Sequence, residues 1–236
     1  MRTFLIVNAD DFGASPGINR GILEAHQRGI LTSTSLMVNM PASEAAAAMG
    51  RALPELSVGL HADLTAELAD LSEGLAQRLA AALAAQLRRF EKLMRRAPTH
   101  LDSHHNTHRD PRALPHFVEL AQRHGLPLRE HSPVRYFSKF YGQWGGATHP
   151  EQISAQSLAR MLRTEIGEGI TELSCHPGYV EPDFVSGYAA ERELEVRALC
   201  DPVIRHILTQ REIQLVSYHQ LHRLIPTAKE RSLCLQ

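Results

Sequence analysis

Cysteine is scarce in this sequence, and the three present, Cys175, Cys200 and Cys234, are an odd number. Disulfide frameworks need paired cysteines and form mainly in oxidising compartments, so we expect free thiols in a reducing compartment. The apolar start, residues 3–7, is too short for a signal peptide and lacks a small-residue cleavage site. Together these absences predict a cytoplasmic protein.

Long apolar runs and a strong charge of either sign are also missing. No stretch approaches the roughly 20 apolar residues of a membrane span, so we predict none. The formal net charge is −1, which argues against a nucleic-acid-binding surface. Hydrophobic residues make up 43% of the chain, too many for a disordered protein. With 236 residues and no interdomain linker, the chain predicts a single domain over residues 1–236.

Strand-like and helix-like segments alternate from end to end, which is typical of parallel strands in an α/β fold. Because about seven strands are expected, the pattern comes close to the eight of a (β/α) barrel. The predicted strands are residues 3–9, 34–40, 56–60, 99–103, 126–129, 170–175 and 213–218. The longest predicted helix covers residues 66–96. Residues 131–150 show no clear period and predict a long ordered loop.

The first strand ends in two adjacent carboxylates, Asp10 and Asp11. Neighbouring side chains on a strand point to opposite faces, so we expect the strand to open into a loop that turns both toward one cavity. Two carboxylates in one site repel each other unless a cation lies between them. The pair therefore predicts one metal ligand and one general base. The alternative is an Asp pair in a turn, or at the N-cap of a helix near Ser15.

Histidines follow three other predicted strands, at His61, His104 and His176. The carboxyl ends of parallel strands meet on one face of a barrel, where active sites are built. One Asp and two His, with positions left for water and substrate, make a common catalytic metal set. A hydrogen-bonded structural role is the alternative for each histidine. We expect His100 and His108 at the surface or behind the site.

Four motifs together resemble a known family. They are Asn8–Gly13, Gly59–His61, Thr99–His105 and Cys175–Gly178. In these motifs the chain resembles the YdjC-like carbohydrate deacetylases, which include chitooligosaccharide deacetylase and hopanoid-biosynthesis-associated proteins. The resemblance implies an irregular (β/α) barrel of the glycoside hydrolase/deacetylase type that removes acetyl from an N-acetylated sugar. It also implies a divalent metal, Mg²⁺, with Zn²⁺ or Mn²⁺ as alternatives, bound by Asp11, His61 and His104, with Asp10 as base.

A deacetylase must also protonate its amine leaving group, and His176 is the best candidate acid. Arg129 or Arg135 could hold an acidic or hydroxyl-rich part of the substrate, although both could instead be structural ion-pair partners. Tyr141 and Trp144 could stack on a sugar ring, with core or dimer packing as the alternative.

The loop formed by residues 131–150 is predicted to cover the rim of the site. Its aromatic residues are Tyr136, Phe140, Tyr141 and Trp144. Because this cluster is too apolar to lie freely in water, we expect a homo-oligomer, a dimer, in which the loop shapes a neighbouring pocket.

Other functions remain open at this level. A barrel phosphoesterase would often use two metals about 4 Å apart with a bridging carboxylate, but few spare carboxylates follow the strands. A non-catalytic sugar- or metal-binding barrel would need only one of the two adjacent Asp residues. Glycoside hydrolysis lacks the expected Glu pair.

Overall fold

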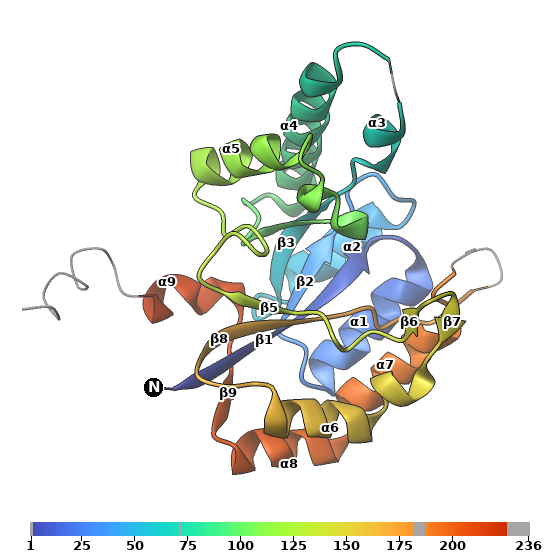
Figure 1. Ribbon diagram of the computed structural model, residues 1–236, viewed down its shortest axis with the longest axis vertical. Helices are drawn as coiled ribbons and strands as arrows, with labels where there is room; N and C mark the ends of the chain where they lie inside the picture. Colours follow the sequence, from blue (N-terminus) through green and yellow to red (C-terminus); the bar gives the residue numbers. More distant parts are fainter. Residues whose placement is uncertain (1, 71, 182–186, 226–236) are drawn as a thin grey trace, which may run out of the picture.

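The computed structural model describes residues 2–70, 72–181 and 187–225 (Figure 1). The strands are β1 (Thr3–Phe12), β2 (Ser33–Leu36), β3 (Ser57–Ala62), β4 (Leu101–Ser103), β5 (Arg135–Phe137), β6 (Gln143–Trp144), β7 (Ala147–Thr148), β8 (Gly169–Cys175) and β9 (Ile213–Leu215). The α-helices are α1 (Pro16–Gln27), α2 (Ser43–Ala52), α3 (Thr65–Ala69), α4 (Leu75–Met94), α5 (Leu114–His124), α6 (Ala155–Thr164), α7 (Ala190–Cys200), α8 (Pro202–Gln210) and α9 (Leu221–Leu224). Cys234 lies outside the described residues.

β1 lies at the centre of a parallel sheet with the order β4-β3-β2-β1-β8-β5. On one side β1 pairs with β8 from Thr3 to Ala9. On the other side β9 pairs with the start of β1, and β2 pairs with its end. Because the strands are parallel, the carboxyl ends of β1, β2, β3, β4 and β8 lie at one edge of the sheet.

The sheet curls so that its two outer strands are joined by one short stretch of chain. Leu128 forms a parallel bridge with Leu101 of β4, and a few residues later the chain enters β5 beside β8. Residues 128–134 thus connect the two edges of the sheet, β4 and β5, with a single bridge and no full strand. The predicted irregular (β/α) barrel is confirmed.

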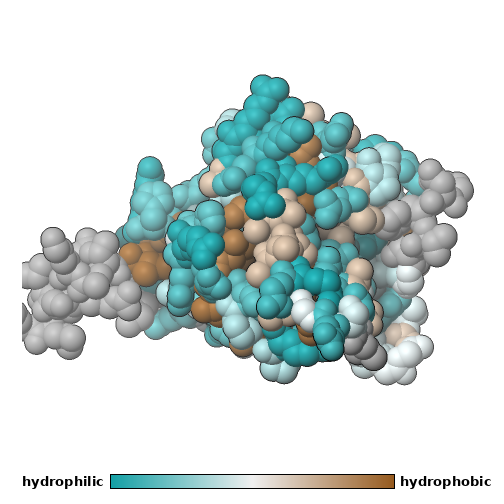
Figure 2. Space-filling view, turned by 90° about the horizontal axis from the view of Figure 1, so that it is seen from above, coloured by the Kyte–Doolittle hydropathy of each residue, from teal (hydrophilic) through white to brown (hydrophobic). Residues whose placement is uncertain are grey.

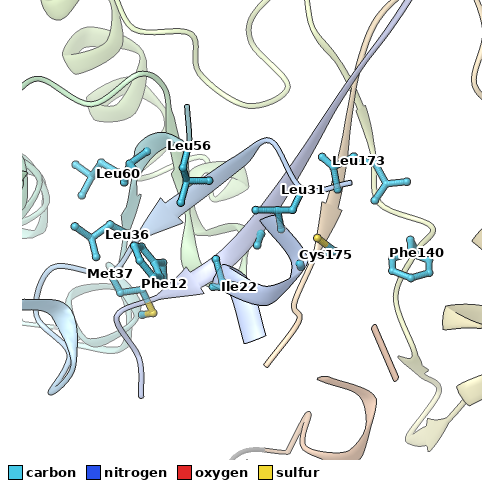
Figure 3. Close-up of a cluster of buried hydrophobic side chains, with 14 of the residues drawn as sticks. Phe12, Ile22, Leu31, Leu36, Met37, Leu56, Leu60, Phe140, Leu173 and Cys175 are labelled. Carbon is cyan, nitrogen blue, oxygen red and sulfur yellow. The ribbon is translucent and has the colours of Figure 1, made fainter. Parts of the chain in front are cut away.

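β1 is buried on both faces, as its continuous apolar run predicts. Leu5 and Val7 belong to a large core cluster that also contains Leu173 of β8. Ile6, on the opposite face, packs in a smaller cluster with Tyr218. Figure 3 shows part of the large cluster between the sheet and its helices. The alternation along β1 therefore leaves Asn8 and Asp10 on the same face as Ile6.

Helix α1 follows β1 in the chain and packs against the segment that follows β8. The Ser15 hydroxyl accepts a hydrogen bond from the Ile18 N–H at 3.1 Å and Pro16 begins the helix, so both start signals are present. Figure 1 shows α1 beside α7. Gly21 lets α1 approach the backbone of Gly178, because a Cβ at Gly21 would lie 2.5 Å from the Gly178 Cα.

Five predicted elements were wrong in detail. The strands predicted at residues 34–40 and 213–218 end earlier, at Leu36 and Leu215. The long helix over residues 66–96 is broken into α3 and α4, because Asp70 accepts the Ser72 N–H in a turn and Gly74 has a φ of 76°. The strand predicted at residues 126–129 is reduced to the single Leu128 bridge, since Pro127 has no N–H to donate. Residues 131–150 are not all loop: they contain β5 and the antiparallel hairpin of β6 and β7.

The surface agrees with a chain whose apolar side chains are mostly internal. Figure 2 shows a largely hydrophilic face on which hydrophobic residues form smaller patches. Among the described residues, no helix combines the length and apolar character that a membrane span requires.

Candidate active site

A bulge at the end of β1 brings both adjacent carboxylates to one cavity. The β1–β2 register shifts between Ala9 and Phe12, and Asp11 has a φ of 68°. An extra residue in a bulge cancels the normal alternation of side chains. The sequence predicted that the strand would open into a loop at the Asp pair. This was wrong, because β1 continues to Phe12. Both Asp10 and Asp11 are 4% exposed and line the same cavity.

Asp11, His61 and His104 come together from three strand ends. The Asp11 Oδ1 lies 3.1 Å from the His104 Nδ1 and 3.5 Å from the His61 Nε2. One ligand atom from each residue lies within 4.8 Å of the others. A carboxylate oxygen and two imidazole nitrogens at this spacing are a donor set that suits a divalent cation.

Asp102 fixes the orientation of His61 from behind. The His61 Nδ1 lies 2.7 Å from the Asp102 Oδ1, so an Nδ1–H directed there leaves Nε2 facing Asp11. The other Asp102 oxygen accepts a hydrogen bond from the Ser35 hydroxyl at 2.6 Å. Asp102 is completely buried, and this arrangement is the one that holds ligating histidines in metal sites.

Arg129 lies beneath the site, on the segment that joins the two edges of the sheet. Its guanidinium donates two hydrogen bonds of 2.8 Å to Asp10. It also contacts Asp102 at 2.7 Å and Glu172 at 2.6 Å. Arg129 is 2% exposed and is not in the cavity wall, so of the two roles suggested by the sequence it has the contacts of an ion-pair partner.

The charges around the carboxylates shift several pKa values strongly. Burial alone would raise the pKa of Asp10, but Arg129 and His61 outweigh it and lower it. Burial would likewise raise the pKa of Asp11, which hydrogen bonds from His104 and His61 hold well below its usual value. Burial would lower the pKa of His61, yet Asp102 and Asp10 raise it to about 10. The site therefore carries an excess of negative charge that a proton, or a cation, balances.

His176 follows β8 and faces the two carboxylates across the cavity. Its Nε2 lies 3.9 Å from the Asp10 Oδ2. Among the described residues its buried Nδ1 has no hydrogen-bond partner, which in the neutral ring favours the tautomer with the proton on Nε2. Burial lowers the pKa of His176, although Asp10 and Asp11 oppose this.

Helix α7 supplies functional residues that the sequence reasoning missed. Arg192 donates a hydrogen bond of 2.6 Å to the Asp11 Oδ2, and Glu195 accepts one from the His176 N–H. Burial raises the pKa of Glu195 to about 8, against hydrogen bonds from Tyr188 and from the backbone of His176 that lower it. The available signal was the i, i+3 spacing of Arg192 and Glu195 on a helix face that also buries Val196.

These residues line or lie just beneath a cavity of about 720 Å³. The predicted site residues in its wall are Asp10, Asp11, His61, His104, Tyr141 and His176. The segment 131–150 contributes Tyr136, Ser138, Tyr141 and Gln143, so it lies at the rim, as predicted.

Two predicted substrate-binding residues lie outside the cavity wall. Arg135 donates to the Thr171 hydroxyl at 2.9 Å. Trp144 is 50% exposed on the β6–β7 hairpin and stacks on His149 with ring centroids 3.5 Å apart. By contrast, Tyr141 stacks on Tyr188 at 4.8 Å within the wall.

His100 and His108 lie behind the site and not at the surface, which is one of the two placements expected for them. His100 is 1% exposed, with its Nε2 3.1 Å from the Ser35 hydroxyl. His108 is completely buried between Ser103 and Glu130.

Comparisons with known proteins point to one family. The sequence model of the YdjC-like protein family matches residues 4–210. A carbohydrate deacetylase from Geobacillus stearothermophilus is 39% identical over 95% of this chain and 100% of its own length. A chitooligosaccharide deacetylase from Serratia marcescens is 34% identical over 94% of this chain and 100% of its own.

Solved structures agree with the fold. A protein from Enterococcus faecalis described as a cellobiose-phosphate cleavage protein is 26% identical, with a TM-score of 0.81 over 94% of this chain and 99% of its own. A family 4 acetyl xylan esterase from Clostridium thermocellum shares the fold at 14% identity, with a TM-score of 0.58 over 94% and 93% of the two chains.

The predicted enzyme class agrees with the names of the two deacetylases, and the predicted family is confirmed. This chain belongs to the YdjC-like protein family.

Proposed function

We propose that this protein is a metal-dependent deacetylase of N-acetylated sugars. The observation that carries the proposal is the convergence of Asp11, His61 and His104 beside a separate, ionised carboxylate, Asp10, in one cavity. The names of the related carbohydrate deacetylases support the substrate class.

The donor set fits a divalent metal on the chemistry of its atoms. Asp11 would offer Oδ1, His61 its Nε2 and His104 its Nδ1, while Asp102 holds the far nitrogen of His61. When bound, such a metal activates water and stabilises negative charge on the acetyl oxygen. We propose Mg²⁺, which the family resemblance implies, with Zn²⁺ and Mn²⁺ as alternatives. The Asp11 carboxylate suits Mg²⁺ and Mn²⁺, and the two imidazoles suit Zn²⁺.

Proton transfer is assigned to the two groups on either side of the cavity. Asp10 is held ionised and oriented by Arg129, so it can accept a proton from the attacking water. His176, protonated as the imidazolium, then donates its Nε2 proton to the leaving amine as the amide C–N bond breaks. The imidazole becomes neutral, and acetate and an amino sugar are released. Acid and base lie close enough to serve one substrate, since Nε2 and Oδ2 are 3.9 Å apart.

Tyr141 is the predicted substrate-binding aromatic that the geometry supports. It lies in the cavity wall and its ring edge contacts His176, with centroids 5.5 Å apart. A sugar ring stacked there would present its acetamido group near the acid.

The phosphoesterase alternative has less support. A second group of possible metal ligands, Asp10, His61 and Asp102, lies beside the first. The Arg129 guanidinium, however, contacts both Asp10 and Asp102, and a second cation there would face its positive charge.

The proposal is tested by measuring acetate release from a panel of N-acetylated mono- and oligosaccharides, with and without a chelator. We expect release that a chelator abolishes and that Mg²⁺, Mn²⁺ or Zn²⁺ restores to different extents. A phosphorylated sugar that yields inorganic phosphate, with no acetate from any substrate, would favour the phosphoesterase.

A further inference from the structure

Helix α7 holds both backbone polar groups of His176. The Glu195 carboxylate accepts a hydrogen bond from the His176 N–H, and the Arg192 guanidinium donates one of 3.3 Å to the His176 carbonyl. The two side chains are three residues apart and therefore lie on the same helix face. The residue that we assign as the acid is thus held by side chains from one helix.

The same Glu195 carboxylate also holds the aromatic wall of the cavity. Its second oxygen accepts a hydrogen bond from the Tyr188 hydroxyl. That hydroxyl in turn accepts the Gly142 N–H at 2.9 Å. The Tyr188 ring stacks on Tyr141 with an interplanar angle of 5°.

The His176 imidazole lies beside this tyrosine pair and forms a T-shaped contact with each ring. Its ring centroid lies 5.5 Å from that of Tyr141 and 5.5 Å from that of Tyr188. One buried carboxylate therefore connects the acid, the segment before α7 and the segment after β5. Glu195 is 0% exposed and does not line the cavity, so it acts only through these neighbours.

We propose that Glu195 is a positioning residue that sets the His176 imidazole against the Tyr141–Tyr188 pair, so that His176 can protonate the leaving amine. The proposal rests on the proposed deacetylase function and deepens it.

A glutamine cannot replace Glu195 in this role. The ionised form of Glu195 accepts at both oxygens, and the N–H and the O–H that the two oxygens receive stabilise this form against burial. The glutamine side chain has one accepting oxygen and one NH₂ donor, so only one of the two links survives. The other partner then faces a buried donor, and the His176 ring loses its fixed place relative to the tyrosines.

The experiment compares two leaving groups. An N-acetylated sugar releases an amine that needs a proton, whereas 4-nitrophenyl acetate releases a phenolate that leaves without one. If Glu195 positions the acid, we expect Glu195→Gln to lower kcat for the sugar about 10–100-fold, part of the usual contribution of a general acid. Hydrolysis of the ester should change less than about 3-fold, because its leaving group needs no acid.

A second test variant and a control variant accompany Glu195→Gln. Tyr188→Phe removes the hydroxyl that donates to Glu195, and we expect a smaller loss with the same preference for the amide. This variant replaces Glu195→Gln in the test if Glu195→Gln fails to fold. Glu193→Gln is the matched control, because Glu193 lies on α7 with its side chain 42% exposed and contacts Arg197 at 3.6 Å. It should behave as wild type on both substrates.

Two results would overturn the inference. Wild-type rates of Glu195→Gln on both substrates would show that the link to His176 has no effect. Equal losses on amide and ester would assign Glu195 to general stability of the site. A wild-type enzyme that released no acetate from any N-acetylated sugar would overturn the proposed function itself, which is a distinct result.

Discussion

The buried Arg129 guanidinium donates a hydrogen bond of 2.8 Å to each oxygen of Asp10 beneath the cavity floor. The same guanidinium contacts Asp102 and Glu172, so it balances carboxylates from β1, β4 and β8. It thereby joins the short connecting segment to three strands of the sheet. Arg129 is a structural centre of the site as well as the partner of the proposed base.

Removing Arg129 should destabilise the protein severely. Arg129→Met leaves buried carboxylates without their cation, and breaking a buried ion pair from one side costs about 3–5 kcal/mol. We expect the free energy of unfolding in urea to fall by that amount. Arg135→Met is the control, and at this exposed position we expect a change within about 0.5 kcal/mol. Equal stabilities for the two variants would contradict the assignment.

Gly21 should resist a substitution that usually stabilises helices. In a helix interior Ala is favoured over Gly by about 1 kcal/mol. In α1, however, the new Cβ would meet the Gly178 Cα at 2.5 Å and its N at 2.8 Å, so backbone must move. We expect Gly21→Ala to lower the free energy of unfolding by about 1–3 kcal/mol.

Because Gly178 follows His176 closely, Gly21→Ala should also lower kcat/KM. Gly167→Ala is the control, because nothing in the described part of the chain lies within 4 Å of the Cβ that it adds. A Gly21→Ala variant more stable than wild type would show that the two segments separate without loss.

Stability should fall between about pH 6.5 and pH 4 because of His100. Burial lowers the pKa of His100 to about 4, although Asp102 opposes the shift. An unfolded His, with a pKa near 6.5, binds a proton in this range while the folded one does not, so acid favours unfolding. The shift corresponds to about 3 kcal/mol, fully present above pH 6.5 and lost as the pH falls to 4.

The measurement is urea unfolding at pH 4.5 and pH 7, with a chelator present so that metal binding does not contribute. His100→Asn should unfold with a smaller difference between the two pH values than wild type. The same difference in both proteins would assign the pH dependence to other groups.

The sequence predicted the positions of the candidate ligands better than the local backbone around them. His61, His104 and His176 each lie at or just after a strand end, because alternating strands and helices with apolar runs identify parallel strands reliably. The bulge at Asp11 was not predicted, since only a small fraction of Asp residues adopt αL and nothing in a single sequence marks which ones do. Periodicity also cannot locate Arg129, whose place in the fold follows from long-range ion pairs.

Trp144 gives a test of the predicted dimer. Phe140 is completely buried within its own chain, whereas Tyr141 is 37% and Trp144 50% exposed. Exposed aromatic side chains of this kind are common at protein interfaces. We expect sedimentation velocity to show a dimer that Trp144→Ala weakens and that Val203→Ala, on the exposed face of α8, does not. A monomeric wild type at all concentrations would rule out this role.

The separate roles of Asp10 and Asp11 are the central claim, and the paired Asn variants test it most directly. The measurement is Mn²⁺ affinity, by titration calorimetry, together with acetate release for each variant. We predict that Asp10→Asn keeps its affinity for Mn²⁺ and loses about 10²–10⁴-fold in turnover, the contribution of a general base. Asp11→Asn should lose the metal itself. Loss of Mn²⁺ binding in Asp10→Asn, with binding kept in Asp11→Asn, would contradict the account and exchange the two roles.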